Sequence, residues 1–388
     1  PYDQTKPWRF RTPTEKADTF GFIDVRSPAS KTKLCASCHI GDVEQGRVVT
    51  HEMYAAGHPP LPGFEIETFV SQMPRHWAEF TEKSNEVKDL FIKHTADPLY
   101  QPKTFKKKSL HRTRSLLAGA LVSSSEYLRL AGQLADESIK SPVKRESWPE
   151  LAVFDCYACH HDLKSPSWRQ QRKAPLGVPG RPPLQEWPFT LARIALKLDG
   201  VPTADIDARL ADVRKALASQ PFGSAKELSK PARDAAAWFY AKGQDLERKF
   251  LTREQGILLL KEIATVASAE TLDYDSARQL VWAFQVVSDD LKGDLPEAKT
   301  IAEVIDQERW RVEQRKKEDR IVWLPEPNAK DMFLLNLRAG RKAATALPGD
   351  KMARQTTEVD LEHVLPRIAN YEPARFQASF RKIAEALK

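Results

Sequence analysis

Cysteine, methionine and long apolar runs are scarce in this chain. Its 388 residues include four cysteines and four methionines. The longest apolar stretches are short, such as LLAGALV at 116–122 and ILLL at 257–260, whereas about 20 residues are needed to cross a bilayer. The sequence therefore predicts no transmembrane segment, and it leaves peripheral association with a membrane open.

A strong excess of either charge is also lacking. The 60 Lys and Arg residues against 53 Asp and Glu give a formal net charge of +7, which is weaker than the basic bias of most nucleic-acid-binding proteins. We therefore expect no nucleic-acid partner. The densest cationic run, KTFKKKSLHRTR at 103–114, is compatible with a solvated helix start, with a docking surface for an acidic partner, or with neutralisation of the carboxylates of a cofactor.

The few cysteines all fall in two copies of one short motif. The copies occur in KLCASCHIGD at 33–42 and in FDCYACHHDL at 154–163. Each has the form C-x-x-C-H, the attachment signature of c-type haem, in which both thiols form thioethers with the haem vinyl groups and the next histidine binds the iron. The sequence thus predicts two covalently bound haem c groups, held by Cys35, Cys38 and His39 and by Cys156, Cys159 and His160.

Three other uses of these cysteines stay open at this stage. They could form two C-x-x-C disulfides, which are strained and usually redox-active. They could also form a four-cysteine zinc site, or they could be free buried thiols. None of these uses requires a histidine directly after both pairs, so haem attachment is favoured.

Haem attachment of this type takes place outside the cytoplasm. We therefore expect the protein in the periplasm or on the outer face of a cell envelope. A chain that begins at Pro1 without methionine is what removal of a signal peptide after export would leave.

Histidine is concentrated in the first half of the chain. Eight of the nine histidines precede residue 162, and the exception is His363. We therefore place both haems in the first half and interpret the surplus histidines there as sixth ligands of the iron. His58 is preferred because Gly57 permits close backbone approach and the two prolines that follow stiffen a wall for a flat macrocycle. His161 is preferred because it points away from the iron of His160 and could reach a neighbouring haem.

His51 and His111 are the alternative distal ligands. His51, in VVTHEMYAAG, either binds iron or orients a haem propionate. His111 lies on a predicted helix whose same face carries Ser115, Ala118 and Val122, small side chains that would leave room for a porphyrin. The other histidines are weaker candidates, interpreted as structural or helix-end residues: His76, His94 and His363.

The segments LCASCHIG, HEMYAAGHPPLPGFE and FDCYACHHDLKSPSW resemble multihaem c-type cytochromes of the bacterial periplasm, over roughly residues 8–190. These cytochromes are electron carriers in which a C-x-x-C-H haem is often followed by a Gly-His-Pro ligand. The resemblance implies His39 and His160 as proximal ligands and favours His58 and His161 as distal ones. Such proteins usually carry four or more haems. With two attachment sites here, either further haems belong to an upstream segment or some histidines serve haems of a partner chain.

The hydrophobic pattern predicts a mainly α fold in two domains. Residues 1–185 are expected to form a loop-rich dihaem cytochrome domain with helices over 64–94 and 109–138. Residues 186–388 are expected to form a helical bundle that serves as a scaffold or docking domain. The bundle helices are predicted over 203–220 with Thr203 as cap, after a capping box of Thr252 and Gln255, near Asp273 or Asp275, over 297–320, and after Pro373.

Two haems with two histidine ligands each favour electron transfer. The expected partners are redox proteins, including other cytochrome subunits of a larger complex. If one iron kept an open sixth position, the chain could instead be a haem enzyme that acts on peroxide or nitrogen oxides.

Overall fold

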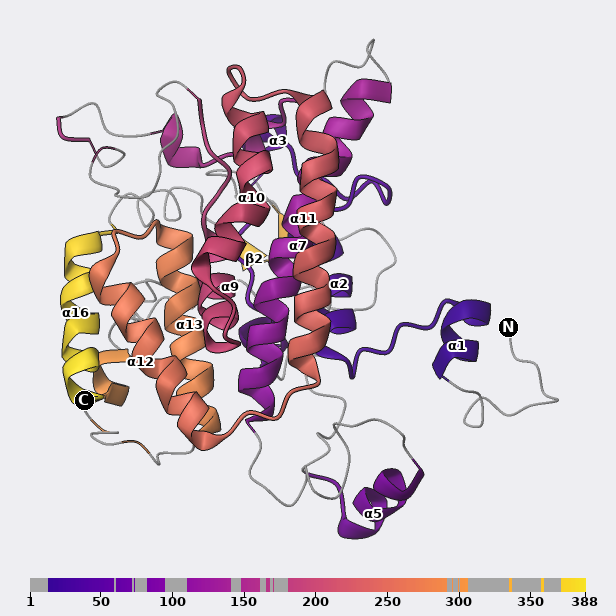
Figure 1. Cartoon of the computed structure of the whole chain (residues 1–388), viewed down its shortest axis with the longest axis vertical. Helices are drawn as coiled ribbons and strands as arrows, with labels where there is room; N and C mark the ends of the chain where they lie inside the picture. The colour runs from indigo at the N-terminus through magenta and orange to yellow at the C-terminus, as the bar shows by residue number, and fades with distance from the viewer. Residues whose placement is uncertain are drawn as a thin grey trace.

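The computed structural model confirms the mainly α fold (Figure 1). It describes residues 13–58, 61–71, 73, 82–94, 110–140, 148–160, 165–167, 170, 181–291, 295, 299, 301–305, 335–336, 357–358 and 371–388. Within these residues, no helix is both apolar enough and long enough to cross a bilayer.

The secondary structure of the described residues is mainly α-helical. The helices are α1 (Pro13–Phe20), α2 (Pro28–His39), α3 (His51–Ala55), α4 (Ile66–Ser71), α5 (Asn85–His94), α7 (His111–Lys140), α9 (Trp187–Leu198), α10 (Thr203–Ala218), α11 (Ala225–Glu247), α12 (Arg253–Ala269), α13 (Tyr274–Asp290) and α16 (Pro373–Ala386). Two short 3₁₀ helices, η4 (Leu151–Val153) and η5 (Cys156–Ala158), and one parallel pair of two-residue strands, β1 (Leu335–Asn336) and β2 (Thr357–Glu358), complete the elements.

Several helix starts follow the predicted capping chemistry. Thr252 and Gln255 form the complete capping box of α12, and Asp273 caps α13 by accepting a hydrogen bond from the Ser276 amide. The prediction of Thr203 as a cap is wrong. Pro202 occupies the cap position of α10, where no side chain accepts a hydrogen bond, and Thr203 is already the first helical residue.

The helix boundaries differ from the predictions where the chain turns between periodic segments. The region 64–94 contains two helices, α4 and α5, with residues between them outside the described set. Of the predicted helix over 297–320, residues 299 and 301–305 are described and are helical. The sequence analysis missed α11, which contains Pro231 and Gly243, because both residue types are unfavourable inside helices.

Helix α7 lies at the centre of the molecule, alongside α11 (Figure 1). A Cβ atom on Gly243 of α11 would lie 2.8 Å from Val122 Cγ2 and 3.2 Å from the Ala118 carbonyl oxygen. Small residues therefore let the two helix backbones approach closely. The prediction that Ala118 and Val122 leave room for a porphyrin is wrong, because α11 covers them.

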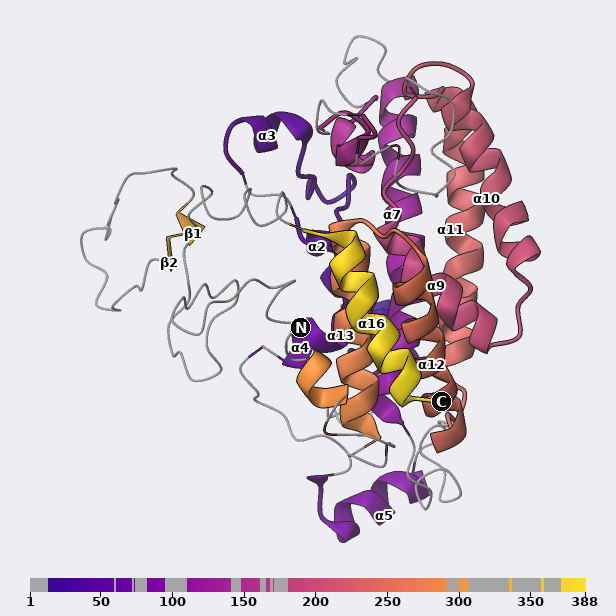
Figure 2. The same cartoon turned by 90° about the vertical axis from the view of Figure 1, so that its left-hand side faces the viewer.

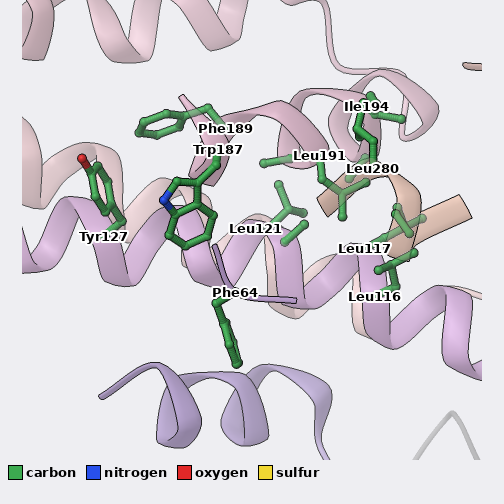
Figure 3. Close-up of a cluster of buried hydrophobic side chains, with 14 of the residues drawn as sticks. Phe64, Leu116, Leu117, Leu121, Tyr127, Trp187, Phe189, Leu191, Ile194 and Leu280 are labelled. Carbon is green, nitrogen blue, oxygen red and sulfur yellow. The ribbon is translucent and has the colours of Figure 1, made fainter. Parts of the chain in front are cut away.

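One hydrophobic core extends across the predicted domain boundary at residue 185. It joins side chains before the boundary, such as Phe64 and Leu121, to others after it, such as Leu191 and Leu280 (Figure 3). In the view of Figure 2, helices α9, α10 and α11 lie to the right of α7, and α2 and α3 lie to its left. The division into two domains stays a prediction about sequence organisation, since the two parts share their core.

Candidate functional site

The first C-x-x-C-H motif forms the C-terminal end of α2. Ser27 caps the helix by accepting a hydrogen bond from the Ser30 amide at 3.2 Å, and Pro28 occupies the first turn, where its missing N–H costs little. The helix ends at His39. Cys35 is half-buried and Cys38 is exposed, so at least one thiol of this motif faces solvent.

The His39 ring packs against two phenylalanines. Its centre lies 5.4 Å from that of Phe64, with the ring planes inclined by 17°, and 5.1 Å from that of Phe69 in an edge-to-face arrangement. Burial lowers the pKa of His39. The neutral imidazole, which is the form that binds metals, is therefore favoured at neutral pH.

The second motif has a different local structure. Its first three residues form η5, and Asp155 caps this turn by accepting a hydrogen bond from the Tyr157 amide at 3.0 Å. The Asp155 amide donates to the Pro183 carbonyl oxygen at 2.9 Å, and Phe154 forms an antiparallel bridge with Leu184. The motif is thus held by a distant part of the chain rather than by a helix.

Tyr127 of α7 anchors this region from the core. Its hydroxyl donates to the Val153 carbonyl oxygen and accepts a hydrogen bond from the Gln185 amide at 3.0 Å. The Gln185 side chain in turn donates to the Ala152 carbonyl oxygen at 2.9 Å. A fully buried phenol therefore joins η4 to the strap of residues 181–186.

The Cys156 thiol has a strongly raised pKa. Burial, followed by the nearby carboxylate of Asp275, raises the pKa of Cys156 to about 12, although the residue keeps an exposed surface. The protonated thiol is therefore favoured at neutral pH. Burial likewise raises the pKa of Tyr54 to about 12, with Cys156 among its charged neighbours.

His51 and His160 face each other at the second motif. Their ring centres are 6.2 Å apart and their planes are inclined by 29°. The His51 amide donates to Glu150 Oε1 at 2.7 Å, and the same oxygen accepts a hydrogen bond from the Ala152 amide at 2.9 Å. One carboxylate therefore holds the start of α3 against η4.

The His51 and His160 rings lie close together with their planes inclined by 29°. Imidazole nitrogens bind metals such as zinc at about 2.0–2.1 Å, so these two histidines are candidates to hold one metal. Two large apolar side chains near this site in sequence, Met53 and Leu151, are exposed by 40% and 37%.

The described ring contacts do not bring His58, one of the two preferred distal ligands, to either motif histidine. His58 is half-buried, and its ring contacts Tyr54 at 6.1 Å. His111 is half-buried, with Nδ1 3.3 Å from Arg114 Nη2, and its predicted room for a porphyrin is occupied by α11. The remaining predictions lie outside the described residues, or for His94 outside the described side chains: His76, His94, His161 and His363.

The alternatives for the cysteines fit this arrangement less well. All four cysteines are free thiols. Among the described residues, which include both C-x-x-C pairs, no three metal-binding side chains converge. Burial also raises the pKa of Cys35, and disulfide exchange requires the thiolate.

Sequence reasoning ranked His51 below His58 and did not detect Glu150 or Tyr127. No local pattern could have found these two, because their partners lie 99 and 26 residues away. Comparisons of the chain with family models, with curated proteins and with solved structures find no match. Its function is therefore inferred from its own residues.

Proposed function

We propose that this protein is a dihaem c-type cytochrome that transfers electrons. Cys35, Cys38 and His39 would hold one haem, and Cys156, Cys159 and His160 the other. The proposal is supported by two C-x-x-C-H motifs that use every cysteine, by thiols that solvent reaches at both motifs, and by neutral-imidazole chemistry at His39.

The pairing of His51 and His160 carries the proposal. Their rings lie next to each other with centres 6.2 Å apart, so we assign His51, together with His160, as a residue that would hold the iron of the second haem. A haem iron that is bound by two histidines can exchange single electrons, and it has no free position for a substrate.

The chain's contribution is to fix these ligands and to limit water. Glu150 holds the His51 backbone against η4, which keeps the ring in place without binding it. Tyr127 and the 181–186 strap hold the residues just before Cys156. Because such residues orient the ligands rather than bind the iron, we expect them to act on affinity and potential.

The wider setting follows from the same proposal. Thioether attachment takes place outside the cytoplasm, so the expected site of action is the periplasm or the outer face of the cell envelope. The partners would be redox proteins, including other cytochrome subunits of a complex. The helices after residue 185 would serve as a scaffold or docking surface.

The first motif supports a second candidate function. The described ring contacts of His39 are with Phe64 and Phe69, not with a histidine. An iron held there with an open sixth position would suit a haem enzyme that acts on peroxide or nitrogen oxides.

Haem count decides the main proposal. The intact mass of the exported protein should exceed that of the bare chain by two haems. The double variants Cys35→Ser with Cys38→Ser, and Cys156→Ser with Cys159→Ser, should each lose one. A colourless protein, or a mass equal to the bare chain, would exclude haem attachment and with it both candidate functions.

Spectroscopy of the ferric protein separates the two candidates. Optical and electron paramagnetic resonance spectra with low-spin signals alone would support the electron carrier. A high-spin component that shifts when cyanide or peroxide is added would instead support an open site, and its loss in the Cys35 and Cys38 double variant would locate that site at the first motif.

A further inference from the structure

A small apolar recess lies between the 181–186 strap, α9 and α10, outside the two motifs. Its volume is about 240 Å³. Its walls are formed by buried apolar side chains: Leu184, Phe189, Leu210, Val213 and Leu217. Pro182 and Pro183 add rigid backbone to one side. The recess is therefore built from structure that changes little when a ligand enters.

The rim of the recess is positively charged. Three guanidinium groups line it, those of Arg181, Arg193 and Arg214, against the single carboxylate of Glu186. An apolar interior with a cationic rim is complementary to a molecule that has an apolar body and one negative end.

Two of these arginines are arranged as a pair. Arg193 Nη2 and Arg214 Nη1 lie 3.0 and 3.2 Å from the same oxygen, Asp207 Oδ1. Since each guanidinium has five N–H donors, one bond from each to Asp207 leaves further donors, and the two positive charges exceed the shared carboxylate by one. Planar guanidinium groups bind carboxylates through two parallel hydrogen bonds.

The pair stands at the boundary between two recesses. Arg193, Arg214 and Glu186 also line a larger recess of about 590 Å³ that extends to α12 and to Asp273. The other charged groups of the larger recess are Asp207, Glu262, Glu270, Asp273 and Lys197, so a ligand carboxylate is favoured at the arginine pair and disfavoured farther into that recess.

We propose that this recess binds a small aromatic carboxylate, with its ring among Leu184, Phe189 and Val213 and its carboxylate on Arg193 and Arg214. A cavity of roughly 150 Å³ holds a benzene molecule in another protein, so about 240 Å³ accommodates a substituted ring. The Phe189 ring on the wall offers the offset or edge-to-face contact that favours an aromatic body over an alkyl chain. The site is independent of haem attachment.

Calorimetry on the full chain with 4-ethylbenzoate, 4-ethylbenzyl alcohol and acetate as probes tests the ring and the charge separately. The benzoate should bind saturably, and the neutral alcohol and acetate at least about tenfold more weakly. Equal binding of the alcohol, equal binding of acetate, or no saturable binding of the benzoate would each overturn the proposal.

Two arginines on the same helix provide a matched pair of variants. Arg214→Gln should weaken benzoate binding about tenfold and leave alcohol binding unchanged. Arg209→Gln, which removes an equal charge from α10 beside Trp238, should leave both unchanged. Ala218→Trp, at the half-exposed end of α10, should fill the recess and abolish binding. If Ala218→Trp does not fold, equal effects of the two arginine variants would still refute the site.

Discussion

The two C-x-x-C-H motifs share a five-residue pattern and differ in almost everything around it. The first ends a 12-residue α-helix, and its histidine packs on phenylalanine rings. The second begins with a single 3₁₀ turn, and its histidine faces another histidine. Under the proposed function, the motif would therefore specify the chemistry of attachment, while the surrounding chain would specify the environment of each haem.

The origin of the difference lies in the flanking residues. Ser27 and Pro28 supply a helix start before the first motif, and α7 offers a surface on which α2 packs. Before the second motif, Glu150 and Asp155 each cap a short turn, and Tyr127 fixes the carbonyl oxygen between them. Local capping and one buried hydroxyl replace the helix there.

The largest effect that separates the two motifs is expected from His51→Ala. Because His51 is assigned to one iron only, the variant should convert one haem from low-spin to high-spin and leave the other unchanged in the optical and electron paramagnetic resonance spectra. His58→Ala is the control and should change neither haem. Conversion by His58→Ala and not by His51→Ala would reverse the assignment.

The next effect is expected near the first motif, where the free energy of unfolding should depend on pH through Glu65. Glu65 follows Phe64 and is buried, and burial raises its pKa from 4.5 to about 7. Between these pH values the folded state holds a proton that the unfolded state has released, so stability decreases as pH rises from 4.5 to 7. The contribution amounts to about 3 kcal/mol at 1.36 kcal/mol per pH unit.

Glu65→Gln should remove this dependence. Unfolding free energies from denaturant titrations at roughly pH 4.5 and roughly pH 8 should differ less in the variant than in the unchanged protein, by about 3 kcal/mol. Other groups titrate in both proteins and cancel in the comparison. An equal pH dependence in the two proteins would show that Glu65 ionises normally.

A smaller effect is expected at the second motif from Tyr127→Phe. The change leaves the Gln185 amide and the Val153 carbonyl oxygen without the hydroxyl, which should destabilise the fold by about 1–3 kcal/mol. Hydrogen exchange of the amides in residues 152–158 should increase more than exchange in α2. Tyr240→Phe is the control. Tyr240 is half-buried, and its substitution should change the free energy of unfolding by about 0.5 kcal/mol or less.

The smallest effect on stability is expected in α12, outside both motifs. Thr252→Ala removes the capping box of α12 and should lower the free energy of unfolding by about 1 kcal/mol, with no change in the spectrum of either haem. Thr203→Ala is the control, because Thr203 makes no cap hydrogen bond. Equal losses in the two variants would contradict the capping assignment.

The fold was largely predictable where the signal is local. The capping box of α12, the start of α13 and the long periodic helix α7 all follow from residues within a few positions of one another. Helix α11 was not predictable from local signals, because tertiary contacts with α7 stabilise a sequence that contains Pro231 and Gly243.

The candidate site was predictable only in part for the same reason. The two C-x-x-C-H motifs are readable directly, since the chemistry requires adjacent residues. The approach of His51 to His160 depends on Glu150, which bonds to a backbone amide 99 residues away. No periodicity or spacing in the chain encodes such a contact, and His58 in its Gly-His-Pro context therefore appeared the better candidate.

The close packing of α7 and α11 has a consequence for how the chain can be shortened. Nearly all of α7 between Thr113 and Ala135 is buried, and its Ala118 and Val122 side is shaped to the Gly243 backbone. A fragment that kept α7 without α11 would expose a wide stripe of small residues to water, so a shortened chain should retain α11 or a substitute for it.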